Sequence, residues 1–233
     1  MSSLVPIVAE TLGLPQPSMN VLAMTLRKNG LISSGGRGRG GAEMRPPDVT
    51  NLLLAAMAGG HAKDAHEIVA RLREASVTPG ANQYDDPPRP IENLPLFMQP
   101  HSLGAALDAI LVSYAADGGL IDDEYQLPIT NISLTVTFPH LVCYRAELWL
   151  DNGSENWTLR YHRNHPAFDG VPKDKMNDVA RSLLAGRGDL EFTARVTSTT
   201  FYDLAQALEE SAADNTAQQL RETLARKTGR QSL

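Results

Sequence analysis

The stretch from residue 14 to residue 54, LPQPSMNVLAMTLRKNGLISSGGRGRGGAEMRPPDVTNLLL, decides the fold of the N-terminal third of the chain. Residues 18–29 predict one helix, because Ser18 is a suitable N-cap and Gly30 stands where glycine commonly ends a helix. The apolar positions of this helix are Val21, Leu22, Met24 and Leu26. The next two residues, Leu31 and Ile32, predict a short buried strand.

A basic, glycine-rich segment follows, SSGGRGRGGAEM at residues 33–44. Five glycines leave too few side chains to build a core, so the segment predicts an exposed loop that carries Arg37 and Arg39 outward. Asp48 or Thr50 can cap the helix that comes next. The order of helix, turn, helix, short strand, basic loop and helix is typical of a winged helix-turn-helix. Such a domain lays one helix in the major groove and a basic wing on the DNA backbone.

This order of residues resembles the DNA-binding heads of MerR-type regulators, phage excisionases and lambda-type small terminase subunits. The resemblance covers residues 1–75 and is carried by Leu26, Gly30, Leu31, Ile32, Arg37, Arg39, Arg45, Asp48, Val49 and Leu52. Two positions depart from the MerR pattern. Asn20-Val21 replace the arginine and tyrosine that often open the helix, and Glu43-Met44 replace a tyrosine near the end of the wing. The resemblance implies a partner, double-stranded DNA.

The candidate DNA-binding residues are Gln16, Ser18, Asn20, Arg27, Lys28, Arg37, Arg39 and Arg45. The first three lie at the start of the second helix, where base edges are usually met, and asparagine can bind adenine. The basic residues suit phosphate contacts. The alternative for each position is a solvated polar side chain. For the glycine-rich loop, a DNA wing is favoured over a plain surface loop or an RNA contact.

The composition is that of a soluble globular protein, with 42% apolar and 21% charged residues in a chain of 233. We expect a cytoplasmic protein, because no apolar run approaches the roughly 18 residues of a membrane span and the N-terminus lacks the regions of a signal peptide. The net charge is −6, but residues 1–80 carry 8 Lys+Arg against 6 Asp+Glu, whereas residues 81–233 carry 13 against 21. The acidic excess therefore lies outside the predicted DNA-binding head.

The rest of the chain predicts a linker and a second domain. Six prolines in residues 76–100 favour an irregular linker. Residues 101–211 predict an α+β domain with an antiparallel sheet, used for oligomerisation or partner binding, and residues 212–233 a polar tail. In this domain the alternation in 129–138 indicates a strand, and Asn152-Gly153 predicts a hairpin. The predicted helices are residues 4–12, 18–29, 49–58, 62–75, 102–116, 175–185 and 201–211; the remaining predicted strands are 141–150, 156–162 and 190–197.

No pattern favours an enzyme. The glycine-rich loop lacks the Gly-Lys-Ser/Thr of a phosphate-binding loop, and no nucleophile, base and acid stand in a catalytic arrangement. His162, His165 and Asp169 have the side chains of metal ligands, but Pro166 interrupts them and no fourth ligand is near. The single cysteine, Cys143, excludes a Cys-based metal site. We therefore expect no catalytic residues, no cofactor and no metal.

These observations predict a winged helix-turn-helix joined to an α+β domain. The favoured function is a site-specific transcriptional regulator that acts as a homo-oligomer, with a dimer preferred because one head with little excess charge should bind weakly. The alternative is a phage-type small terminase subunit, which recognises DNA for packaging as a ring. A protein-interaction module with a degenerate head is a third interpretation. No residue pattern indicates a small-molecule effector.

Overall fold

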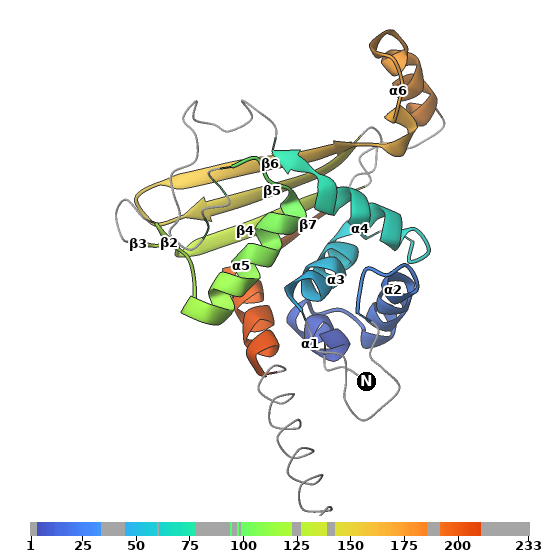
Figure 1. Ribbon diagram of the computed structural model, residues 1–233. Helices are drawn as coiled ribbons and strands as arrows, with labels where there is room; N and C mark the ends of the chain where they lie inside the picture. The colour runs from blue at the N-terminus through green and yellow to red at the C-terminus, as the bar shows by residue number, and fades with distance from the viewer. Residues whose placement is uncertain are drawn as a thin grey trace, which may run out of the picture.

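The protein folds as a helical layer on one side of an antiparallel sheet (Figure 1). Helices dominate the N-terminal part and strands the C-terminal part, which confirms the predicted α+β class. The computed structural model describes residues 4–33, 45–59, 61–77, 94, 97, 99–122, 127–138, 143–185 and 192–210. In this part of the chain, no helix is both long and apolar enough to cross a membrane.

The N-terminal helices are α1 (Leu4–Thr11), α2 (Gln16–Lys28), α3 (Pro46–Ala58) and α4 (Ala65–Glu74). Helix α2 begins earlier than predicted. Its N-cap is Pro15, and Pro17 is tolerated in the first turn, where a backbone N–H has no helical partner. The predicted cap, Ser18, therefore lies inside the helix. Similarly, Arg45 is the N-cap of α3 and two prolines fill its first turn, so neither Asp48 nor Thr50 is the cap.

The strand predicted at Leu31 and Ile32 is absent, and both backbone groups of Leu31 have other partners. Both residues form a bend after α2. The backbone N–H of Leu31 donates back to the carbonyl of Leu26 at 2.9 Å, which closes the end of α2. The carbonyl of Leu31 accepts from the side chain of Asn51. Ile32 is 4% exposed, so the predicted burial is correct even though the predicted backbone conformation is not.

The main sheet has the strand order β1-β6-β5-β4-β7, and every described pairing in it is antiparallel. Its strands are β1 (Ser76–Val77), β4 (Asn131–Phe138), β5 (Cys143–Asp151), β6 (Asn156–Asn164) and β7 (Phe192–Thr197). A second, two-stranded sheet contains β2 (Ile121–Asp122) and β3 (Leu127–Pro128). Strand β4 lies between β5 and β7, so it is not a free edge that could pair with another subunit.

The predicted hairpin at Asn152-Gly153 joins β5 and β6. Gly153 has a φ of +86°, a conformation that glycine adopts at no steric cost. The side-chain oxygen of Asn152 accepts from the backbone N–H groups of Ser154 and Glu155 at 2.9 and 2.8 Å, which fixes the turn. Trp149 pairs with Thr158 and Trp157 with Leu150, so the two tryptophans point to opposite faces of the sheet.

One hydrophobic core connects the helices to the sheet. Helix α5 (Leu103–Asp117) and the helix of residues 198–210 bury apolar side chains in the same cluster as α1 to α4. Leu94 and Phe97, from the predicted linker, are 2% and 3% exposed. The first two linker residues form β1 and pair with β6. The described core is thus continuous across the predicted boundary between residues 1–75 and 101–211, and the separability of these two units stays a prediction.

A polar bridge also crosses this boundary. Arg73 on α4 donates to Asn51 on α3 at 3.1 Å and to Asp108 on α5 at 2.6 and 3.3 Å. Both charged side chains are about four-fifths buried, with 23% and 21% of their surface exposed. Asn51 in turn binds the carbonyl of Leu31. This chain of contacts ties the bend after α2 to a helix of the predicted second domain.

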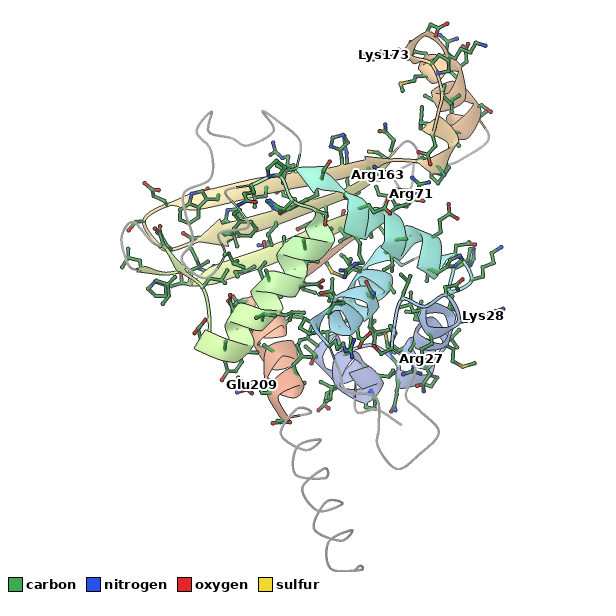
Figure 2. The ribbon with its side chains drawn as sticks, viewed as in Figure 1. Arg27, Lys28, Arg71, Arg163, Lys173 and Glu209 are labelled. Carbon is green, nitrogen blue, oxygen red and sulfur yellow. The ribbon has the colours of Figure 1, made fainter. Side chains whose placement is uncertain are left out.

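An arm projects from the end of β6 (Figure 1). It contains the short helices η2 (Pro166–Phe168) and η3 (Lys173–Lys175) and then α6 (Met176–Leu184). At its base, Arg71 of α4 forms an ion pair with Asp169, and Arg163 forms one with Glu74 at 3.4 Å. Figure 2 shows Arg71 and Arg163 at this base and Lys173 far from it. The predicted tail, residues 212–233, lies outside the described residues.

Candidate nucleic-acid interface

The inward face of α2 determines which of its side chains are available to a ligand. Met19, Ala23 and Leu26 are all 0% exposed, and their spacing of four and three residues places them on one side of the helix. Val21 and Met24 are 51% and 66% exposed. Two of the four apolar positions named from the sequence are therefore exposed, because Met19 and Ala23 occupy the positions against the core.

The outward face of α2 has an apolar centre and polar flanks. On a helix with 3.6 residues per turn, Pro17, Val21, Met24 and Lys28 form the line opposite the buried side chains. Gln16, Asn20 and Arg27 follow one side of this line, and Ser18 and Thr25 follow the other. Gln16, Ser18, Asn20 and Lys28 are exposed, whereas Thr25 and Arg27 are partly buried. We call the residues of this line and its flanks the outward face of α2.

The charge on this helix has a single sign. Its sequence, QPSMNVLAMTLRK, contains no acidic residue, and both of its cations lie in the last turn. Cations at this position are favoured by the negative end of the helix dipole. Figure 2 shows Arg27 and Lys28 at the outer side of the helical layer, away from the sheet. The outward face thus offers hydrogen-bonding side chains at one end and positive charge at the other.

Asp48 holds together the two ends of the segment that contains the predicted wing. One oxygen of its carboxylate accepts from the backbone N–H of Ser33 at 2.8 Å, and the other accepts from the backbone N–H of Arg45 at 3.2 Å. Asp48 is 5% exposed, and these two bonds satisfy its buried oxygens. Arg37 and Arg39 lie outside the described residues. The residues on either side of this segment, Ser33 and Arg45, are therefore both bound by one carboxylate near the N-terminus of α3.

The candidate DNA-binding residues that the structure describes lie on one helix, except for Arg45, which caps α3. Gln16, Ser18, Asn20, Arg27 and Lys28 all belong to α2 and lie on or beside its outward line. Sequence reasoning missed Val21 and Met24, which are the most exposed apolar side chains of this helix. The signal that could have found them is the spacing of Met19, Ala23 and Leu26, which fits a buried helical stripe better than Val21 and Met24 do.

The residues of the possible metal site have other partners. Asp169 pairs with Arg71, and the Nδ1 atom of His165 accepts from the backbone N–H of Ala167 at 3.2 Å. The ring of His165 also stacks on that of Tyr144, with the ring centres 6.3 Å apart. Within the described part of the chain, no three His, Cys, Asp or Glu side chains converge as metal ligands would.

Comparisons of the chain with models of known protein families, with curated proteins and with solved structures found no match. The function is therefore inferred from the chain's own residues and from their arrangement.

Proposed function

We propose that the protein binds double-stranded DNA through the outward face of α2 and acts as a site-specific transcriptional regulator. The observation that carries this proposal is the burial of Met19, Ala23 and Leu26, because it turns a face without acidic residues away from the core. A helix of 13 residues is about 20 Å long and can lie in a major groove about 12 Å wide.

The side chains on this face suit both kinds of DNA contact. Asn20 and Gln16 can each donate to and accept from the edge of adenine, and the exposed apolar groups of Val21 and Met24 can pack on thymine methyl groups. Arg27 and Lys28, at the other end of the helix, can neutralise phosphates. Base contacts at the start of the helix and backbone contacts at its end are the division of roles that helix-turn-helix proteins use.

The predicted wing adds a second backbone contact. Asp48 binds the backbone of Ser33 and Arg45, so the described residues on either side of the predicted wing lie beside α3. Replacing Arg37 and Arg39 with alanine should weaken binding to all duplexes alike. It should also lower the salt dependence by about 0.9 log units for each phosphate that is no longer neutralised.

Selection of bound duplexes from a random library tests the proposed function. The full chain should enrich a short motif, and the enriched duplex should bind more tightly than a scrambled duplex of equal length. A matched control is the Asn20→Ala variant, which keeps the charge of the helix and should lose the preference. Equal binding of all duplexes by the full chain would contradict site-specific recognition.

Assembly state distinguishes the proposed regulator from a small terminase subunit. A head with two excess positive charges needs a second copy to reach useful affinity, because linked heads raise the effective concentration of the second contact. Sedimentation of the full chain should therefore give a dimer that does not grow into larger species as the concentration rises. A closed ring of about eight or more copies would favour the packaging function instead.

A further inference from the structure

The five-stranded sheet has a second polar surface, on the side opposite to the helices. Ile132, Leu134 and Val136 of β4 point into the core, so the alternate residues Ser133, Thr135 and Thr137 point to the other side. Figure 1 shows α3, α4 and α5 on the core side of the sheet. No described helix covers the other side, which we call the open face. The registers of β4, β5, β6 and β7 determine which side chains share it.

Two rows of side chains cross the open face. Arg160, Glu147, Thr135 and Arg195 are successive cross-strand partners on β6, β5, β4 and β7. His162, Arg145, Thr137 and Thr193 form the neighbouring row. Most of these side chains line a cavity of about 580 Å³. The open face is therefore hollowed beside its arginines.

Two of the three arginines on this face have no acidic partner among the described residues. Glu147 pairs with Arg160 at 3.1 Å, and Arg195 donates to the hydroxyl of Ser133 at 3.2 Å. Arg145 and Arg195 are exposed and have no carboxylate within 4.0 Å among the described residues. Asp151, at the far end of β5, is already bound by Asn131 and by the backbone N–H of Gly153. A local positive surface thus exists in a chain with a net charge of −6.

The spacing of the cations fits an extended anion better than one phosphate ion. Arg145 and Arg195 lie in neighbouring rows on strands two spacings apart, which is about 10 Å across the sheet. Trp149 lies on the same face, four residues along β5 from Arg145 and thus about 13 Å away. It is partly exposed and sits between Ser133 and Thr158. A surface that combines separated cations with an aromatic ring provides the two contacts that single strands use, backbone neutralisation and base stacking.

We propose that the open face binds single-stranded nucleic acid, with Arg145 and Arg195 on the phosphates and Trp149 stacked on a base. The binding surface is distinct from the outward face of α2, because the helical layer and the core lie between them. An acidic peptide would satisfy the arginines but would leave Trp149 without a stacking partner. The ligand is therefore a nucleic acid, and its binding does not depend on duplex binding by α2.

A titration of the full chain with a fluorescent 15-nucleotide thymidine oligomer tests this proposal. The Arg145→Ala, Arg195→Ala double variant should bind it at least tenfold more weakly, and its log-log salt slope should fall by about 1.4, because two cations no longer meet the phosphates of a single strand. The matched control removes two cations from the arm, Lys173→Ala with Arg181→Ala, and should bind as the unmodified chain does. Equal weakening in both double variants would indicate non-specific charge attraction and overturn the proposal.

Tryptophan fluorescence provides a second readout, because the chain has two tryptophans on opposite faces of the sheet. The Trp157→Phe variant keeps Trp149 and should be quenched by the oligomer. The Trp149→Phe variant keeps Trp157 and should not be quenched. Polyglutamate of equal charge serves as the competitor. If polyglutamate displaces the oligomer at equal concentration, or if Trp149 is not quenched, the face does not bind single strands as proposed.

Discussion

The outward face of α2 and the open face of the sheet lie on opposite sides of one core and differ in shape. A buried stripe of three residues leaves α2 a narrow, convex surface. Strict alternation along four strands leaves the sheet a broad surface that is hollowed beside its arginines. A convex helix fits a groove, whereas a broad sheet surface suits a strand whose bases are free to stack. Although the whole chain has a net charge of −6, it therefore has two local basic surfaces, and they suit different ligands.

The largest effect is expected on the free energy of unfolding, which should respond differently to substitutions on the buried and the exposed face of α2. Leu26 is 0% exposed, and Leu26→Ala should lower the free energy of unfolding by about 2–5 kcal/mol, because apolar burial is reduced and a cavity is left. Met24→Ala is the matched control, because Met24 is 66% exposed and should change stability by no more than about 0.5 kcal/mol. Urea unfolding measures both. Similar destabilisation in the two variants would mean that α2 is oriented differently.

A smaller destabilisation is expected where the two sides of the molecule are joined. Arg73→Ala should destabilise the protein by about 2 kcal/mol, because it leaves Asp108 and Asn51 without their partner in a partly buried site. Arg71→Ala removes an arginine of the same helix whose partner, Asp169, is exposed, and should destabilise the protein less than Arg73→Ala does. Equal unfolding midpoints for the two variants would show that the bridge does not stabilise the fold.

The strands and the hairpin could be predicted from sequence because their signals are local. Alternation in β4 and Asn152-Gly153 in the turn specify a pleated face and a reversal within a few residues. The partners of Leu31 could not be predicted, because Asn51 lies twenty residues away and is brought near only by the packing of α3. The same holds for Arg73 and Asp108. These two residues lie on either side of the proline-rich stretch that predicted a linker, so nothing local in the sequence indicates their contact.

The two candidate surfaces differ in how visible they are in the sequence. Gln16, Asn20 and Lys28 are polar residues on a recognisable helix, so their side of α2 could be predicted. The exposure of Val21 and Met24 could not, since two apolar stripes were possible and tertiary packing chose the one containing Met19 and Ala23. The arginines of the open face come from three strands, and their proximity depends on strand order and register.

A moderate effect is expected on binding affinity, where variants of the outward face of α2 and of the open face should affect different ligands. Asn20→Ala should lower the affinity for an enriched duplex by about 1–3 kcal/mol, the usual cost of losing one base contact, and should leave thymidine-oligomer binding unchanged. The Arg145→Ala, Arg195→Ala variant should show the opposite pattern. Fluorescence anisotropy with both ligands measures the two affinities. If each variant is weakened equally toward both ligands, the surfaces are not independent.

The smallest effect concerns the arm and its dependence on pH. A hydrogen bond from Arg71 lowers the pKa of Asp169, and the same contact raises the pKa of Arg71. A carboxyl with a lowered folded-state pKa contributes stability above its ordinary pKa and loses it as the pH falls through the folded-state value. Asp169→Asn should therefore differ slightly from the unmodified chain near neutral pH and match it in acid. Urea midpoints across this range measure the difference, and a gap that widens in acid would contradict the assigned pair.

The salt dependence of duplex binding tests the central claim, that the outward face of α2 contacts DNA, most directly. The binding constant of the full chain for one duplex would be measured between low and moderate salt, beside an Arg27→Ala, Lys28→Ala double variant. We predict that the variant's log-log slope is smaller by about 1.8, because two cations of α2 no longer neutralise phosphates. An unchanged slope, or a chain that does not bind the duplex at any salt concentration, would contradict it.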